Sequence, residues 1–289
     1  MRKIYLLVLI VSFLHGFCVM ADTLDIRDDS GQLFHFAGPV QRIVSLAPHI
    51  TELVFISGAG AQVVGTVEYS HFPEQARKVP LIGNSQSFDL ERILKLKPDV
   101  ILAWTGGNAE ADLEQLNKSG IPVIKTDVKI LNDIPRLIRL FSRLGGQQQG
   151  FAEADKFNRQ LKQLTKENEH KPRVSVFYQI WNQPLMTLSS HQYISDVIRR
   201  CGGRNILAES ALIAPTIDRE YVLAKNPQVI ITAGSQAWLD EWKRWKQIDA
   251  VRFNQLYRLN PDDIARPVPA ILKGMKQICE FLDQARKAD

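Results

Sequence analysis

The chain has 289 residues, of which 45% are hydrophobic and 23% are charged, as in ordinary globular proteins. This length suits two domains of usual size or one large domain. The formal net charge of +5 arises from basic residues that are scattered along the chain, so it gives no reason to expect a nucleic-acid-binding protein.

Residues 1–21 predict a secretory signal peptide. Two basic residues precede an apolar stretch at residues 4–14, and residues 19–21 supply small side chains for cleavage after Ala21. This stretch is too short to span a bilayer of ~30 Å, and no later segment approaches ~20 uninterrupted apolar residues. We therefore expect a soluble periplasmic protein.

Cys18 lies at the end of this segment and raises the alternative of a lipid anchor. A lipid-modified Cys normally follows a small residue, whereas Phe17 precedes this one, so we favour a free protein that loses Cys18. The mature chain would then contain Cys201 and Cys279. Two cysteines in an oxidising compartment tend to pair, and this pair would tie the second half of the chain to its own C-terminal helix.

The first half of the mature chain reads as a parallel α/β unit. An apolar strand is expected at residues 42–46, and Thr51 stands where the N-cap of a helix ending at Gly58 would lie. A second helix is expected to begin at Asp89 in the stretch DLERILKLKPDVILAW, followed by a fully apolar strand at residues 100–103. Such strands, alternating with helices, indicate a parallel sheet covered on both faces.

The second half repeats this pattern. It contains a strand at residues 173–177, a helix capped by Ser195 and ending at Gly202, and the stretch DREYVLAKNPQVIITA from Asp218. The loops between the elements differ in length, while the elements persist. We therefore predict an α/β fold with two similar parallel-sheet lobes.

Residues 147–170 predict a long helix, because apolar residues recur there at helical spacing with charged residues between them. We divide the chain into a signal peptide (1–21), an N-terminal lobe (22–144), a connecting helix (145–170) and a C-terminal lobe (171–289). Two lobes joined by one helix should leave a ligand cleft between them. The alternative is a single domain in which this segment is an ordinary surface helix.

The sequence gives no indication of an enzyme. It contains no GxxxxGK[ST], GxGxxG or GxSxG motif. His49 and His71 both follow predicted strands, where ligands bind in parallel α/β folds. They form no HxxxH or HExxH pair, and solvated loop histidines explain them as well. We predict no catalytic residue and no bound metal.

Aromatic residues also follow the predicted strands, at the same side of the sheets. These are Tyr69, Phe72, Phe88, Trp104 and Trp181. Rings around a cleft suit a large planar or apolar ligand, although each ring taken alone fits core packing equally well. Gly106-Gly107 are expected to let the backbone approach the ligand closely. Arg266 either meets polar groups of the ligand or pairs with Asp262.

Three stretches, RIVSLAPHITELVFISG, VVGTVEYSHFPEQARKVPLIG and LERILKLKPDVILAW, resemble the substrate-binding proteins of ABC importers for vitamin B12, iron-siderophores and haem. The resemblance covers essentially the whole mature chain. Within the family, LAWTGGNAE and EYSHFP are most similar to members that bind corrinoids. The resemblance implies two α/β lobes bridged by one long helix, a corrinoid in the cleft, and a disulfide within the second lobe, which Cys201 and Cys279 match.

The resemblance also implies roles for individual residues. Four fall at ligand-binding positions: Tyr69, Trp104, Asp262 and Arg266. Glu91 and Glu220 fall on two surface glutamates, one in each lobe, that dock on the permease.

The chain departs from the corrinoid-binding pattern at three positions. Ser85 and Ala214 stand where that pattern has pocket tryptophans, and His71 stands where it has an acid. Phe88 or Trp181 would compensate for the two missing rings. The exact ligand therefore stays open.

We expect a periplasmic protein that captures a corrinoid, such as vitamin B12, and delivers it to an inner-membrane ABC permease with its ATPase. It would be a monomer when free, with no cofactor and no nucleic-acid partner. One alternative is a haem or ferric-siderophore carrier in which Tyr69 or His71 is an iron ligand. Another is a periplasmic sensor or metal-binding protein without a transport role.

Overall fold

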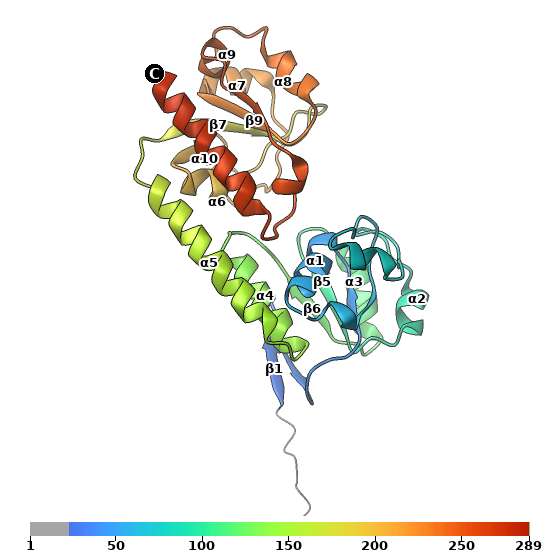
Figure 1. Cartoon of the computed structure of the whole chain (residues 1–289). Helices are drawn as coiled ribbons and strands as arrows, with labels where there is room; N and C mark the ends of the chain where they lie inside the picture. The colour runs from blue at the N-terminus through green and yellow to red at the C-terminus, as the bar shows by residue number, and fades with distance from the viewer. Residues whose placement is uncertain (1–22, 289) are drawn as a thin grey trace, which may run out of the picture.

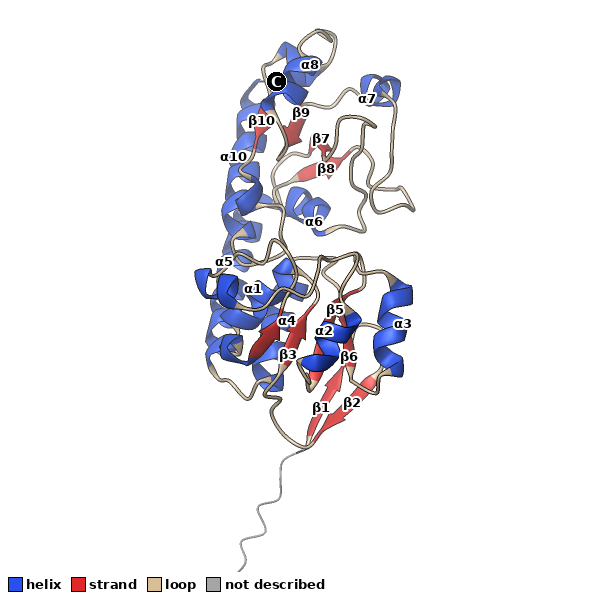
Figure 2. Ribbon diagram, turned by 90° about the vertical axis from the view of Figure 1, so that its right-hand side faces the viewer, coloured by secondary structure: helices blue, strands red, loops and turns tan. Residues whose placement is uncertain are grey.

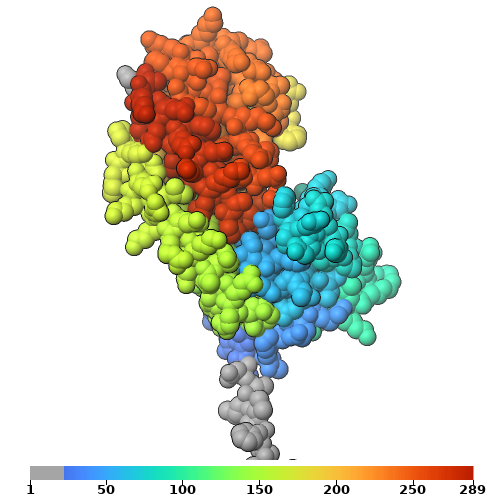
Figure 3. All heavy atoms as spheres, in the orientation of Figure 1, coloured from blue at the N-terminus to red at the C-terminus, as the bar shows by residue number. Residues whose placement is uncertain are grey.

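The computed structural model describes residues 23–288, so the predicted signal peptide and Cys18 lie outside the described residues. Within this range, two α/β lobes lie along one long helix, α5 (Gln149–Asn168) (Figure 1). Drawn as spheres, the lobes meet at a waist beside this helix (Figure 3). No helix among residues 23–288 combines the length and the apolar character that a membrane crossing requires.

The N-terminal lobe is built on a four-stranded parallel sheet with the order β4-β3-β5-β6. Its strands are β3 (Ile43–Ser45), β4 (Val63–Gly65), β5 (Val100–Trp104) and β6 (Val123–Thr126). Its helices are α1 (Pro48–Ile56), α2 (Leu90–Lys95), α3 (Glu110–Lys118) and α4 (Asp133–Leu144). An antiparallel hairpin of β1 (Leu24–Arg27) and β2 (Leu33–Phe36) precedes this sheet.

The C-terminal lobe has its own four-stranded parallel sheet, with the order β10-β9-β7-β8. Its strands are β7 (Val174–Gln179), β8 (Gly203–Asn205), β9 (Val229–Thr232) and β10 (Leu256–Arg258). Its helices are α6 (Tyr193–Arg200), α7 (Arg219–Lys225), α8 (Gln236–Trp242), α9 (Asp249–Arg252) and α10 (Ile271–Ala288). Short 3₁₀ turns lie at Gly60–Gln62, Glu74–Lys78 and Pro261–Asp263.

The two sheets have the same topology. Numbered within its own lobe, each sheet has its strands in the spatial order 2-1-3-4. The predicted α/β fold with two similar parallel-sheet lobes is therefore confirmed. The side chains of β9 are all buried, as are those of the first four residues of β5, because helices cover both faces of each sheet.

The two acidic helix starts are also confirmed. The Asp89 carboxylate accepts a hydrogen bond from the amide of Arg92 at 2.9 Å, and the Asp218 carboxylate accepts one from the amide of Tyr221 at 2.7 Å. Each side chain thus satisfies one of the free amides at the start of its helix.

The N-caps predicted at Thr51 and Ser195 are wrong. Helix α1 begins at Pro48, whose fixed φ favours the first helical position, and Ala47 is its N-cap. The N-cap of α6 is Gln192, whose side chain accepts a hydrogen bond from the amide of Ile194. Both hydroxyl residues therefore lie inside the first turns of their helices, and both are buried.

Helix α5 packs against both lobes. It contacts α1 and α4 of the N-terminal lobe, and α6 and α10 of the C-terminal lobe. Its buried residues Ala154, Phe157 and Leu161 belong to one hydrophobic cluster that extends into both lobes. Because this cluster is continuous, α5 holds the lobes against a common core rather than acting as a free linker.

Asp196 of α6 ties the lobes together beside this helix. Its carboxylate accepts a hydrogen bond from the amide of Leu131 in the N-terminal lobe at 3.0 Å, and it pairs with Arg199 and Arg200. Burial alone would raise the pKa of this carboxyl, but the Leu131 amide and the Arg200 guanidinium outweigh burial and lower it. Arg200 also donates to the Asn132 side chain at 2.6 Å.

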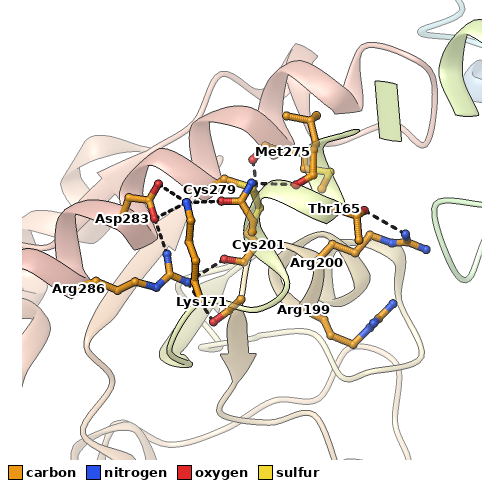
Figure 4. Close-up of a disulfide and its surroundings, with 12 residues drawn as sticks. Thr165, Lys171, Arg199, Arg200, Cys201, Met275, Cys279, Asp283 and Arg286 are labelled. Carbon is orange, nitrogen blue, oxygen red and sulfur yellow. Dashed lines mark hydrogen bonds and ion pairs between the residues drawn. A yellow bond between two sulfur atoms is a disulfide. The ribbon is translucent and has the colours of Figure 1, made fainter. Parts of the chain in front are cut away.

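The predicted disulfide between Cys201 and Cys279 is confirmed. It joins the end of α6 to α10, and the two residues are 78 positions apart (Figure 4). Arg286, also on α10, donates to the carbonyl oxygens of Cys201 and Gly202, and its guanidinium pairs with Asp283. The disulfide and these polar contacts fix the C-terminal helix to the rest of its lobe.

Candidate functional site

A cavity of about 500 Å³ lies between the two lobes. Figure 2 shows the loops above the N-terminal sheet facing α6 of the C-terminal lobe. The N-terminal lobe contributes Pro48, His49, Tyr69, Ser85, Trp104, Gly106, Asp127 and Val128, and the C-terminal lobe contributes His191, Gln192, Tyr193, Ile213, Ala265, Arg266 and Pro267. Many of these residues follow a strand, as expected for ligand sites in parallel α/β folds.

Trp104 ends β5 and lies half-buried in the wall of the cavity. Its amide donates to the Asn108 side chain at 2.7 Å, and the Asn108 amide group donates to the carbonyl oxygens of Leu46 and Ser85. Asn108 is buried, so these bonds are shielded from water. One asparagine thus joins three segments of the N-terminal wall.

The two glycines after Trp104 leave room for its indole ring. A Cβ atom at Gly107 would lie 2.1 Å from a ring carbon of Trp104, and one at Gly106 would lie 2.8 Å from the ring nitrogen. The sequence predicted a close approach of backbone to ligand, and Gly106 does line the cavity. The space that the glycines leave is nevertheless filled by the indole.

His49 lies under Trp104, with only 5% of its surface exposed. The two rings meet edge to face, with centroids 5.2 Å apart. Burial lowers the pKa of His49 to about 4, so the imidazole is neutral at ordinary pH. Within residues 23–288, its ring nitrogens have no hydrogen-bond partner, and the side chain borders the cavity.

Tyr69 lies at the rim of the cavity and is 74% exposed. Its backbone has a φ of 66°, in the left-handed region that residues other than glycine rarely adopt. The ring of His71 is next to it, with centroids 6.2 Å apart. The N-terminal lobe therefore presents the exposed ring of Tyr69 and the half-buried ring of Trp104 to the cavity.

Arg266 reaches from the C-terminal lobe to the N-terminal lobe. Its Nε donates to Glu52 of α1 at 3.1 Å, and its Nη1 donates to Asp262 at 3.1 Å. The guanidinium also lies over the Phe72 ring, 4.7 Å from the centroid. Burial raises the pKa of Glu52, although the charge of Arg266 opposes this. Glu52 is a partner that the sequence did not single out.

The rest of the C-terminal wall combines a buried phenol with an exposed aliphatic loop. Tyr193 is buried and donates to the carbonyl oxygen of Ala265 at 2.8 Å, and burial raises the pKa of its hydroxyl. Ile213 lines the cavity with 52% of its surface exposed, and its neighbour Leu212 is 67% exposed. Ile213 precedes Ala214, where the family resemblance implies a ring.

Asp127 faces this wall from the N-terminal lobe. Burial raises the pKa of its carboxyl, while Lys129 and the amide of Val128 oppose the shift. The cavity therefore borders rings, an aliphatic loop, a neutral imidazole and one carboxyl of raised pKa. Among residues 23–288, no group of three or more His, Cys, Asp or Glu side chains could hold a metal ion.

The structure brings together only part of the predicted ligand set. Tyr69, Trp104 and Arg266 line the cavity, and Asp262 pairs with Arg266. Phe88 and Trp181 do not line it. Phe88 is 8% exposed and packs in the core of the N-terminal lobe, while Trp181 meets Trp238 edge to face, with centroids 5.7 Å apart.

Glu91 and Glu220 occupy the same place in the two lobes. Each lies in the first turn of its helix, two residues after the capping aspartate, and each is exposed. Lys95 lies 3.5 Å from Glu91, one turn later on α2. Such an exposed pair constrains the glutamate little.

Comparison with known proteins shows a family match over most of the chain. Residues 43–262 match a family described as periplasmic binding protein. A vitamin B12-binding protein of Vibrio cholerae serotype O1 is 35% identical over 252 residues, which cover 86% of this chain and 91% of that protein. A vitamin B12-binding protein of Pectobacterium carotovorum is 36% identical over 246 residues, which cover 84% of this chain and 88% of that protein.

Solved structures agree with this match. The crystal structure of the periplasmic vitamin B12 binding protein of Vibrio cholerae superposes with a TM-score of 0.80 at 35% identity, covering 86% of this chain and 99% of that one. A periplasmic heme-binding protein of Roseiflexus has a TM-score of 0.71 at 22% identity, covering 85% of this chain and 99% of that one. This second likeness supports the fold alone.

Proposed function

The chain belongs to the periplasmic binding protein family, and we propose that it captures a corrinoid such as vitamin B12 and delivers it to an inner-membrane ABC permease with its ATPase. The ligand would bind between the lobes by ring contact and apolar burial, with no bond made or broken. The predicted signal peptide would direct the chain to the periplasm, where it would act as a monomer.

The observation that carries this proposal is the cavity between the lobes, in a chain 35% identical to a vitamin B12-binding protein over 86% of its length. Both lobes line the cavity, so a ligand held there contacts both at once. Trp104 and Tyr69 offer ring surface, Ile213 offers apolar surface, and Arg266 offers polar contact. This mixture suits a wide ligand with an apolar face and a polar edge.

The ligand is tested by titrating the purified mature protein with cyanocobalamin, and separately with hemin. We expect saturable one-to-one binding of cyanocobalamin at micromolar concentration or below, measured by calorimetry. Absence of such binding would overturn the corrinoid assignment. Binding of hemin alone would assign the same cavity to haem.

The two exposed glutamates support the second half of the proposal. Glu91 and Glu220 lie at equivalent corners of two lobes with the same topology. A permease built from two similar subunits would need one acidic contact from each lobe. Charge complementarity of this kind steers association and fixes orientation.

Docking is tested with the double variant Glu91→Arg/Glu220→Arg. We expect transport in cells to be lost while cyanocobalamin affinity stays within about twofold of wild type, because neither residue lines the cavity. Each single variant should lose part of the transport. A large loss of ligand affinity in the double variant would contradict the docking role.

A further inference from the structure

Thr51 is the centre of a buried cluster of hydroxyl groups beneath the Tyr69 loop. Its Oγ1 lies 2.8 Å from the Ser45 hydroxyl, 2.6 Å from the Thr66 hydroxyl and 3.4 Å from the Ser70 hydroxyl. Thr66 and Ser70 are also joined directly, at 2.9 Å. Ser45, Thr51 and Thr66 are fully buried, and Ser70 is 4% exposed. Hydrogen bonds shielded from water in this way form a cooperative network.

This cluster connects three elements of the N-terminal lobe. Ser45 ends β3, Thr51 lies on α1, and Thr66 and Ser70 flank the loop that carries Tyr69. Thr51 is the member that joins this loop to the helix, since Thr66 and Ser70 belong to the loop itself. Without the Thr51 hydroxyl, their mutual bond would remain but the network would no longer reach α1.

The backbone conformation of Tyr69 requires support from the surrounding structure. Its left-handed backbone is unfavourable for a residue with a Cβ atom, so the surroundings must hold it. The ring itself makes little packing contact, because 74% of the residue is exposed. The adjacent Ser70, which is bonded to the cluster, therefore fixes the loop on one side of Tyr69, and on the other side the Glu68 amide donates to the carbonyl oxygen of Gly83 at 2.8 Å.

The C-terminal lobe has a counterpart at the equivalent helix. Ser195, in the first turn of α6, donates to the carbonyl oxygen of Ser189 at 2.7 Å and accepts from Asn205 at 2.8 Å. Asn205 also donates to the carbonyl oxygen of Leu188 at 2.6 Å. These bonds hold the segment that continues into His191 and Gln192, both of which line the cavity.

We propose that Thr51 is a positioning residue for the ligand site: its hydroxyl holds the Tyr69 loop in the ligand-binding conformation before ligand arrives, as Ser195 does for the residue 189–192 segment. This inference rests on the proposed function, in which Tyr69 contacts the ligand. A loop that is already ordered loses less entropy on binding, which strengthens binding without adding a contact. Thr51 itself does not line the cavity.

The first test measures hydrogen–deuterium exchange in the ligand-free protein, for peptides that cover residues 66–72. In Thr51→Val we expect exchange there to be roughly 10-fold faster, because the loop opens more often. Thr51→Ser, which keeps the hydroxyl, should exchange like wild type. The matched control is Ser57→Ala, which removes another buried hydroxyl of the same helix region, one that bonds to Val54 instead of the loop.

The second test is a double-mutant cycle on cyanocobalamin affinity, using Thr51→Val and Tyr69→Ala. We expect Thr51→Val to weaken binding about 5- to 10-fold in the wild-type background, and less than about twofold when Tyr69 is already Ala. Thr51→Ser should restore affinity. Equal losses in both backgrounds would overturn the proposal, since Thr51 would then act independently of Tyr69.

The exchange measurement separates this inference from the proposed function. If wild-type protein fails to bind cyanocobalamin, the proposed ligand is wrong, and exchange alone decides whether Thr51 orders the loop. Unchanged exchange at residues 66–72 in Thr51→Val overturns the inference whatever the ligand. If Thr51→Val does not fold, Ser70→Ala replaces it, because Ser70 is the member of the cluster next to Tyr69 and bonds to both Thr51 and Thr66.

Discussion

The two lobes share one topology but supply different walls to the cavity. The N-terminal wall contains the ring of Trp104 and the neutral imidazole of His49, and a network of buried hydroxyls lies beneath its Tyr69 loop, outside the cavity lining. The C-terminal wall contains the exposed Ile213 loop and the cation of Arg266. A duplicated fold can therefore keep its framework while its two ligand-facing edges diverge, because those edges are loops that the sheet order does not constrain.

The lobes also differ in how they are stabilised, and the largest predicted effect follows from this difference. Among the described residues, the disulfide lies in the C-terminal lobe and the N-terminal lobe has none. Cys201→Ala/Cys279→Ala should lower the free energy of unfolding by about 4–5 kcal/mol, because 78 positions separate the two cysteines. Urea unfolding, followed by hydrogen exchange of each lobe, measures this loss.

The loss should appear first in α6 and α10, while exchange in the N-terminal sheet stays close to wild type. Wild-type protein treated with a reducing agent should behave like the double variant. Equal destabilisation of both lobes would contradict the idea that the C-terminal lobe depends on its own covalent tie. That result would mean that the lobes unfold as a single unit through α5.

A smaller effect is predicted for the pH dependence of stability, and it arises from a histidine of the N-terminal wall. His49 is buried with a pKa of about 4, so the folded state disfavours its protonation, whereas the unfolded state takes up the proton near pH 6.5. The contribution of this group is complete above pH 6.5 and is lost as the pH falls toward 4. Lowering the pH from 7 to 4.5 should reduce the contribution of His49 to the free energy of unfolding by about 2–3 kcal/mol.

The measurement compares urea midpoints at both pH values for wild type, His49→Leu and His191→Leu. His49→Leu should remove the acid-induced loss of about 2–3 kcal/mol that this group causes. His191 lines the opposite wall and is exposed, and His191→Leu is the comparison variant from that wall. The same pH dependence in all three proteins would show that burial of His49 is not responsible.

The smallest predicted effect compares one tryptophan from each lobe. Trp104 lines the cavity and Trp181 does not, although both follow or end a central strand and both were predicted to meet the ligand. Trp104→Ala should weaken cyanocobalamin binding by roughly 10-fold, because a ring contact is lost. Trp181→Ala should change it less than about twofold. Calorimetric titration of both variants decides between the two rings.

A large loss in Trp181→Ala would mean that the lobes rearrange on binding and bring this ring to the ligand. Comparable losses of affinity in both variants would show that each lobe contributes a tryptophan to the ligand site, as the sequence predicted. As a control, unfolding midpoints equal to that of wild type would show that neither substitution disrupts the fold.

The sequence predicted the framework well because its signals are local. Buried strands are apolar runs, and Asp89 and Asp218 bond to amides only three residues away. Thr51 was wrongly predicted to be an N-cap because Pro48, which also favours a helix start, lies three residues earlier and begins the helix there. Two of its partners, Thr66 and Ser70, are 15 and 19 positions away in the sequence, so no local pattern reveals them.

The ligand site was predicted less completely because it depends on the direction of side chains. Trp104 and Phe88 both looked like cleft rings, but only tertiary packing determines that Phe88 turns into the core. Asn108 has no motif, since its role consists of bonds to Leu46 and Ser85 in other segments. Glu52 was equally hidden, because its partner Arg266 lies in the other lobe.

The glycines after Trp104 restrict how this protein can evolve. Any side chain at Gly107 would collide with the indole, so Gly107 cannot change unless Trp104 moves or is itself replaced. This contact restricts the substitutions that the N-terminal wall tolerates near Trp104. Ile213 and Leu212 have no comparable neighbour and are largely open to solvent. Substitutions that adapt the site to a corrinoid of different shape should therefore be tolerated at Ile213 and Leu212 more readily than at Trp104 and Gly107.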